Sequence, residues 1–163
     1  MIFLTVGTQL PFDRLVRLLD ELAPSLPMEI YAQIGNAPGY LPRNFAYSTH
    51  LDAAAFEDSV SRADLIVSHA GIGSILTARK AGKPIVLFPR LAARREHRND
   101  HQLATCRQMA TVEGVMVAYD EAELSTQLKD PASYIAPHQG RGADGRIRLE
   151  KALRSFILKR PHF

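Results

Sequence analysis

One stretch of the sequence restricts the fold more than any other, because a glycine-bearing turn and a helix lie between two apolar strands. Residues 65–67 are an apolar run of strand type, and residues 69–74 (His-Ala-Gly-Ile-Gly-Ser) read as a tight turn. Residues 75–81 have helical spacing up to Gly82, and residues 84–88 form a second apolar run. A strand–helix–strand unit joins parallel strands through a right-handed crossover. The chain is therefore expected to contain a parallel sheet.

The turn at residues 71–74 is a candidate anion-binding site. Its backbone N–H groups are expected to point out of the N-terminus of the following helix, where their partial positive charge suits phosphate. Glycine at positions 71 and 73 leaves room for a ligand, and Ser74 can cap the helix or bond a ligand oxygen. The alternative is that the glycines only permit close packing of helix and strand, with His69 as an ordinary loop histidine.

Strands and helices alternate along the rest of the chain. Apolar patterning predicts strands at residues 2–6, 29–34, 45–48 and 115–119, and helices at residues 12–22, 53–63, 100–110 and 121–129. Residues 131–145 read as irregular, and residues 147–158 as a basic amphipathic helix. This alternation predicts a doubly wound parallel α/β sheet. The 163 residues suit a single domain, residues 1–163, with residues 143–163 as a terminal basic helix.

Three predicted loops should meet at one edge of this sheet. Ligands of doubly wound sheets bind outside the carboxyl ends of the strands. The loops that follow Val6, Ser68 and Pro89 all open at that edge. We therefore expect Gly7 and Thr8, the glycine turn and the charged loop at residues 90–99 to converge.

Charge is unevenly distributed between the two parts of the chain. Residues 1–60 carry three basic and seven acidic side chains, whereas residues 61–163 carry 17 basic and 10 acidic ones. A basic second part suits a negatively charged ligand, an acidic partner or an anionic membrane surface. Its many acidic residues and few interleaved aromatics do not favour nucleic acid.

Several features favour a cytoplasmic location. The sequence has no apolar run near the roughly 20 residues of a membrane span, and it opens with strand-like residues instead of a basic leader. The single cysteine, Cys106, cannot form an internal disulfide and fits a reducing compartment.

The segment at residues 96–102 (Glu-His-Arg-Asn-Asp-His-Gln) places seven polar residues before a helix. His97 and His101 have the spacing of zinc ligands on a helix, but Arg98 stands where the zinc-protease motif has glutamate. The other interpretations are a solvated cap, with Asn99 or Asp100 at the N-cap, and a hydrogen-bonding rim for a sugar nucleotide. The arginines that are candidates for neutralising phosphate are Arg90, Arg94, Arg95 and Arg98.

Two common nucleotide-binding motifs are absent from the sequence. The first strand-to-helix turn has Gly7 alone, not a three-glycine dinucleotide fingerprint, and there is no P-loop. The sequence also lacks an Asp-x-Asp pair, whose carboxylates would hold a diphosphate through a metal ion. We therefore expect neither a metal ion nor a cofactor, and a dinucleotide oxidoreductase lacks its signature.

The sequence HAGIGSILTARKAGKPIVLFPR, followed by EHRNDHQ, resembles the C-terminal, donor-binding half of family 28 glycosyltransferases. The N-terminal VGTQLPFDRLV resembles the opening of the small single-domain members. Those members are the cytosolic subunit of the two-part N-acetylglucosaminyltransferase of the dolichol pathway and the PssE-like subunits of bacterial exopolysaccharide synthesis. The resemblance covers about residues 1–130, and it implies the Rossmann-like half of a GT-B glycosyltransferase that binds a UDP-sugar.

The resemblance also implies where the donor contacts lie. The glycine turn would hold the diphosphate, the start of the helix near residue 100 would face the donor sugar, and the first loop would line the cleft. In many relatives a glutamate in the helix after the turn holds the ribose hydroxyls. Thr77 stands there in this chain and can make one hydrogen bond but no bidentate carboxylate contact. The candidate donor-binding residues are Gly7, Thr8, His69, Gly71, Gly73, Ser74, Thr77, Arg90, Glu96, Asn99, Asp100, His101 and Gln102.

The size of the chain adds an expectation about partners. Complete GT-B enzymes have two Rossmann halves, and this chain supplies one. The resemblance therefore implies a membrane-anchored partner subunit with the other half and the catalytic base, a lipid-linked sugar acceptor, and recruitment to the inner face of the cell membrane. The expected reaction is inverting, metal-free transfer of a hexose-type sugar, with the helix dipole stabilising the departing diphosphate. The alternative is a non-catalytic nucleotide-binding or scaffolding module of the same fold.

Overall fold

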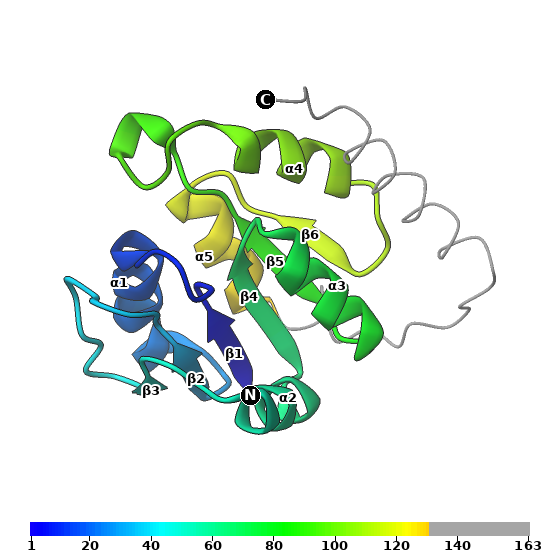
Figure 1. Cartoon of the computed structure of the whole chain (residues 1–163). Coiled ribbons are helices and arrows are strands. Elements are labelled where there is room, and N and C mark those ends of the chain that lie inside the picture. The colour runs from blue at the N-terminus through cyan, green and yellow to red at the C-terminus, as the bar shows by residue number, and fades with distance from the viewer. Residues whose placement is uncertain (131–163) are drawn as a thin grey trace.

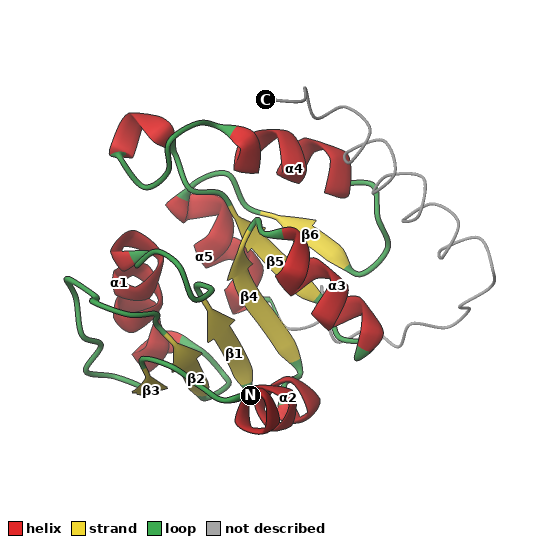
Figure 2. Ribbon diagram, viewed as in Figure 1, coloured by secondary structure: helices red, strands yellow, loops and turns green. Residues whose placement is uncertain are grey.

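The computed structural model describes residues 1–130, and these form a parallel sheet with helices on both faces (Figures 1 and 2). The six strands follow the order β3-β2-β1-β4-β5-β6, and every neighbouring pair is parallel. Their bounds are Ile2–Thr5 (β1), Ile30–Gln33 (β2), Ala46–Ser48 (β3), Leu65–His69 (β4), Ile85–Phe88 (β5) and Val115–Val117 (β6). This confirms the predicted doubly wound α/β fold. The predicted irregular stretch and terminal basic helix lie outside the described residues.

Residues 1–130 contain five α-helices, of which the first four lie between strands and α5 follows β6. Their bounds are Asp13–Leu22 (α1), Ala53–Arg62 (α2), Ile72–Lys80 (α3), His101–Met109 (α4) and Glu121–Lys129 (α5). Two short 3-10 helices, Ala23–Ser25 (η1) and Ala92–Arg94 (η2), complete the described elements. None of the helices in this part of the chain has the length and hydropathy of a membrane span.

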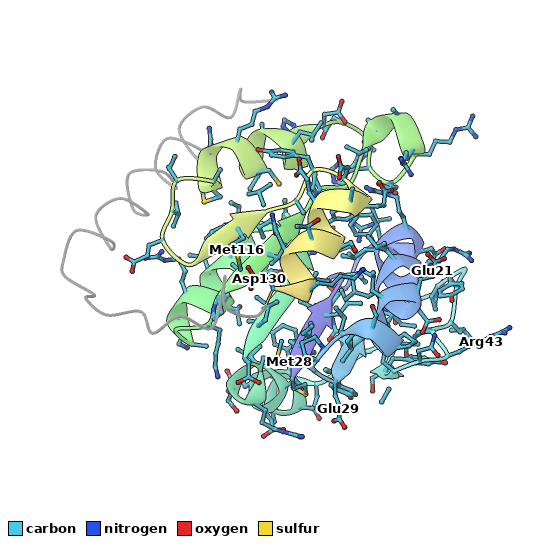
Figure 3. All side chains as sticks on the ribbon, turned by 180° about the vertical axis from the view of Figure 1, so that it is seen from behind. Glu21, Met28, Glu29, Arg43, Met116 and Asp130 are labelled. Carbon is cyan, nitrogen blue, oxygen red and sulfur yellow. The ribbon has the colours of Figure 1, made fainter. Side chains whose placement is uncertain are left out.

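The two faces of the sheet have separate apolar cores. One face packs against α1 and α5, with Leu4, Leu15 and Val67 among its fully buried members. The other packs against α2, α3 and α4, with Phe3 and Ile66 in the sheet. Neighbouring residues of one strand thus point into different cores, because side chains alternate across a sheet. Figure 3, which shows the molecule from behind, has α1 and α5 over the near face.

Within residues 1–130 the predicted helices and strands are present, while several boundaries differ. Helix α3 begins at Ile72, three residues before the predicted start, and β4 continues to His69 instead of ending at Val67. The extension follows from pairing, since His69 lies opposite Phe88 in the β4–β5 register. Strand β6 ends at Val117, two residues before the predicted end, because it pairs with β5 alone and lies at the edge of the sheet.

The strand order places a switch point between β1 and β4. Going outward from β1, the chain adds β2 and β3 on one side, and it then adds β4, β5 and β6 on the other. The loops that leave β1 and β4 therefore diverge to opposite faces of the sheet and leave a crevice between them. This crevice is where a doubly wound sheet binds its ligand.

Candidate functional site

A pocket of about 770 Å³ opens at this switch point. Its walls come from the loop after β1, the end of β2, the segment from Leu51 into α2, the end of β4, α3, and the residues after β5. This volume is in the range of small-molecule sites. Among the candidate donor-binding residues, those that line the pocket are Gly7, Thr8, His69, Gly73, Ser74, Thr77, Arg90 and Gln102.

The glycine turn begins α3 directly at the pocket. Gly71 is the N-cap residue, in an extended conformation, and no side chain caps the helix. Ser74 therefore does not cap α3, and it is one of the residues that line the pocket. The N–H groups of Ile72, Gly73 and Ser74 lie in the first turn of the helix, so they have no intrahelical carbonyl partner. A side chain at Gly73 would meet nothing within 4 Å, which means that the helix N-terminus faces open space.

His69 lies between two glycines at the end of β4. A Cβ atom at Gly71 would overlap its Nε2, and one at Gly7 would come within 2.9 Å of its Cε1. Gly7 also has a φ of +79°, a conformation that other residues adopt only with strain. The two glycines therefore allow the imidazole to occupy the floor of the pocket.

The protonation of His69 follows from its surroundings. The Ser68 hydroxyl donates to the Thr5 carbonyl at 2.9 Å and lies 3.3 Å from His69 Nδ1. Because the single hydroxyl proton is already used, Nδ1 is the donor to Ser68, and Nε2 carries the lone pair. Burial, and then the positive charge of Arg90, lowers the pKa of His69 to about 4. The ring is thus neutral near pH 7.

Arg90 is held beneath the loop that follows β1. It is 2% exposed, and its guanidinium donates to the carbonyls of Val6 at 2.9 Å, Leu10 at 2.7 Å and Pro11. Burial lowers its pKa to about 10, so it keeps its charge at neutral pH. Arg90 therefore adds positive potential to the pocket that it lines, and three of its guanidinium bonds go to the loop; a contact between Arg90 and phosphate stays a prediction.

Gln102 and Thr77 also have partners within the protein. Gln102 is 8% exposed, and its Oε1 accepts from the backbone N–H of Arg90 at 3.0 Å. The Thr77 hydroxyl donates to the Gly73 carbonyl at 3.0 Å, one turn earlier in α3. Both side chains line the pocket, so each combines a local bond with a position beside the ligand space.

Five candidate residues do not line the pocket. Gly71 lies against His69, as described above, and His101 is exposed at the start of α4. Asn99 Oδ1 accepts from His97 Nδ1 and from the His101 backbone, and Asp100 Oδ1 accepts from the Ala92 backbone at 2.9 Å. Asp100 occupies the N-cap position of α4 without a capping side-chain bond.

Glu96 faces away from the pocket. Its carboxylate pairs with Arg14 and lines a second cavity, of about 440 Å³, between α1, the loop after β5 and α5. Glu96 therefore does not line the pocket in this structure, and its role in a donor rim stays a prediction. The ion pair explains the difference, because a largely buried carboxylate is stabilised only beside a cation.

Sequence reasoning missed one wall of the pocket. Residues of α2 and the segment before it face the space, including Leu51, Phe56 and Glu57, and Gln33 does so from the end of β2. The helical spacing of residues 53, 56, 57 and 60 was visible, but the pattern alone does not distinguish a face that covers the core from one that lines a pocket.

No three His, Cys, Asp or Glu side chains come together within residues 1–130 in a way that could hold a metal ion. The His97 and His101 pair thus has no third ligand in this part of the chain. The polar residues that line the pocket include charged ones, Asp52, Glu57, Lys80 and Arg90, beside the hydroxyl and amide residues and the neutral imidazole of His69.

The profile of the glycosyltransferase family 28 C-terminal domain matches residues 1–136. The chain belongs to this family. The match covers every described element, so the family 28 domain accounts for both the sheet and the pocket at its switch point. It also confirms the resemblance seen in the glycine turn and the segment at residues 96–102.

Among curated proteins, the family 28 domain is similar to the UDP-N-acetylglucosamine transferase subunit ALG13 of Homo sapiens. The two are 32% identical over 121 residues, which is 66% of this chain and 10% of the human protein. The Mus musculus protein of the same name is 31% identical over the same shares. The chain therefore spans about a tenth of the length of these relatives.

Solved structures show the same fold. A solution NMR structure of ALG13 superposes with a TM-score of 0.60 at 19% identity, over 91% of this chain and 93% of that one. The crystal structure of Acinetobacter baumannii MurG gives 0.56 at 20% identity, over 96% of this chain and 48% of that one. The calicheamicin glycosyltransferase CalG4 gives 0.61 at 16% identity, over 96% and 38%. This family 28 domain thus has the Rossmann-like fold of GT-B glycosyltransferases.

Proposed function

We propose that the domain binds the UDP-sugar donor of an inverting glycosyltransferase. The observation that carries this proposal is the N-terminus of α3, whose first-turn N–H groups adjoin the pocket at the switch point beside Gly73 and Ser74. Such groups bind a diphosphate without a metal ion. The buried charge of Arg90 adds to the positive potential. Membership of family 28 and the similarity to a UDP-N-acetylglucosamine transferase subunit support a nucleotide-sugar as the ligand.

The reaction that fits this ligand is transfer with inversion. A hydroxyl oxygen of the acceptor forms a bond to the anomeric carbon, the bond from that carbon to the diphosphate breaks, and UDP leaves with the electron pair. The hydroxyl proton passes to a base. The helix N-terminus would stabilise the negative charge that develops on the diphosphate.

The proposal includes a second subunit. GT-B enzymes close two Rossmann halves around the donor, and closure keeps water from the reacting sugar. We place the base and a polyprenyl-diphosphate-linked acceptor on a membrane-anchored partner, in exopolysaccharide or glycolipid synthesis. The domain would act at the inner face of the cell membrane, and it would have little transferase activity alone.

The Thr77 contact supports a second candidate, a non-catalytic nucleotide-binding or scaffolding module. The Thr77 hydroxyl already donates its proton to the Gly73 carbonyl. At this position α3 therefore provides fewer hydrogen bonds to a nucleoside than a carboxylate would. The two candidates differ in one observation. If the partner alone transfers sugar at the rate of the complex, the domain is not catalytic.

The donor-binding proposal is tested by titration calorimetry with UDP on the wild-type domain and on Gly73→Val. The new side chain has open space around it, so it should enter the ligand space and abolish binding without unfolding the protein. Ala122→Val is the matched control, because Ala122 is also exposed and is also the second residue of its helix, α5. Unchanged UDP affinity in Gly73→Val, with Ala122→Val like the wild type, would sink the proposal.

A further inference from the structure

Arg14 connects three parts of the protein although it does not line the pocket. It is the second residue of α1, and its side chain is 12% exposed. Its Nε and one terminal nitrogen bind the two oxygens of Glu96 at 2.7 and 2.9 Å, and the same terminal nitrogen donates to the Pro89 carbonyl at 2.9 Å. The other terminal nitrogen lies 3.3 Å from Glu121 of α5. Arg14 therefore binds the loop after β5 (residues 89–100) at its first residue and at its middle.

Glu96 also makes a hydrogen bond within the loop at residues 89–100. The Glu96 oxygen that accepts from the Arg14 terminal nitrogen also accepts from the Leu91 backbone N–H at 2.9 Å, and the Glu96 side chain is 13% exposed. A largely buried, bidentate pair of this kind has short, charge-assisted bonds and one preferred geometry. The Arg14–Glu96 pair thus determines the course of the loop between Pro89 and Glu96.

Arg90 makes the opposite connection. It comes from the loop after β5, and it binds three carbonyls of the loop after β1 (residues 6–11). Its guanidinium carbon lies 4.5 Å from the centre of the Phe12 ring, and that of Arg14 lies 5.3 Å from the same ring and 4.3 Å from Phe88. The loop after β5 is therefore bound by Arg14 of α1, the loop after β1 is bound by Arg90, and both guanidinium groups contact the Phe12 ring.

Both of these loops line the pocket. The first contributes Gly7 and Thr8, and the second contributes Arg90 and His97. The Arg14 contacts lie on the side of the loop that faces α1 and α5, over whose ends it passes (Figures 1 and 3). Arg14 thus supports one wall of the pocket from the side of the loop that faces away from the ligand space.

We propose that Arg14 is a positioning residue of the donor site, acting through Glu96. The pair holds the loop at residues 89–100 in its binding geometry before the ligand binds. Arg90, which belongs to that loop, in turn holds the loop at residues 6–11 through its three bonds to backbone carbonyls. Preorganisation of this kind strengthens binding because less loop entropy is lost when the ligand binds. The inference rests on the proposed donor-binding function and adds a residue to it.

The test compares Arg14→Gln, Glu96→Gln and the double variant. Each single change should weaken UDP binding at least fivefold while the protein stays folded, and the double variant should be no weaker than the worse single one, because both act through one pair. Glu96→Gln keeps an oxygen for the Leu91 N–H, so it provides the milder change if Arg14→Gln unfolds. Arg14→Lys should not restore affinity, since an ammonium group cannot reproduce the bidentate contact.

The matched control is Arg17→Gln, which removes another α1 arginine, one that lies over the Tyr40 ring. It should leave UDP affinity unchanged. Hydrogen exchange supplies the second measurement. The Arg14 and Glu96 variants should expose the N–H groups of Leu91 and Ala92 and those of Val6 and Gly7, which are hydrogen-bonded in the structure, without loss of protection in β1 or β4.

Three outcomes decide the matter. Weakened binding together with exchange confined to the two loops supports the positioning role. Unchanged affinity in folded Arg14→Gln and Glu96→Gln overturns it. If the wild-type domain itself binds no UDP, the donor-binding proposal fails. Hydrogen exchange alone then decides whether the Arg14–Glu96 pair orders both loops. Protection that is unchanged in the variants, or that is lost uniformly over the domain, would refute this ordering role.

Discussion

His69 makes the stability of the domain depend on pH in a window whose upper part lies above the range in which carboxylates titrate. Its pKa falls from 6.5 in an unfolded chain to about 4 in the folded protein, because burial and the nearby charge of Arg90 oppose the imidazolium form. The unfolded state therefore binds a proton near pH 6.5 while the folded state does not. Stability from this group is complete above pH 6.5, falls as the pH drops towards 4, and changes no further below that.

The size of the effect follows from the shift. One pKa unit corresponds to about 1.4 kcal/mol, so the shift from 6.5 to about 4 is worth at most about 3.5 kcal/mol. The ring borders an open pocket, where water screens part of the interaction, and the measured loss should lie below this ceiling.

The assay is urea unfolding of the wild type and of His69→Gln between about pH 7.5 and pH 4.5. The variant has no titrating group at this position, so its free energy of unfolding should fall less steeply in this range. The difference in free energy of unfolding between the wild type and His69→Gln should shrink steadily as the pH falls. Parallel curves for the two proteins across the window would refute the reasoning.

The same residue connects protonation with ligand binding. A diphosphate at the N-terminus of α3 would favour the imidazolium form of His69 and raise its pKa from about 4, so UDP binding should take up a proton near pH 5. Calorimetry in buffers of different ionisation enthalpy would detect this uptake, and His69→Gln should abolish it. Equal apparent enthalpies in all buffers for the wild type would mean that His69 does not face the diphosphate.

Three further predictions concern other groups. Asp20 is 2% exposed and accepts hydrogen bonds from the Tyr40 hydroxyl and from the backbone N–H groups of Arg43 and Asn44. Asp20→Ala should therefore lower the free energy of unfolding, measured in urea, by about 2–3 kcal/mol. Tyr40→Phe removes one of these bonds and should cost less than half as much. Thr77→Glu should strengthen UDP binding about tenfold in calorimetry, by one charge-assisted bond to the ribose, while Thr126→Glu, at the equivalent position of α5, should have no effect. UDP affinity should be the same in excess EDTA as with magnesium or manganese, because the helix N-terminus replaces a cation; dependence on added metal would contradict this.

Much of the fold followed from local patterns. The apolar runs at β1, β4 and β5, the helical spacing of α1 and α5, and the stop at Gly82 depend on neighbouring residues, and each appears in the structure. Boundaries were less predictable, because the length of a strand depends on its partner. His69 belongs to β4 only because Phe88 of β5 lies opposite it.

The candidate site was predictable where the signal was local. The glycines at 7 and 73, and the residues after β1, β4 and β5, were visible because the carboxyl edge of a parallel sheet collects them. The wall formed by α2 was not predictable, since a helix that follows a strand can cover the core or the pocket with the same spacing of apolar residues.

The sequence by itself determined the element types, the parallel sheet and the turn that opens α3, because these depend on backbone preferences and on periodicity within a few residues. Only the tertiary structure decided which charged side chains meet. Arg14 and Glu96 are 82 positions apart, and Arg90 binds a carbonyl 84 positions away. A charged side chain on a loop can face a ligand or a buried partner, and the choice depends on which cation or carbonyl the folded chain brings within about 3 Å. For that reason Glu96, which reads as part of a ligand rim, is instead the partner of an arginine on α1.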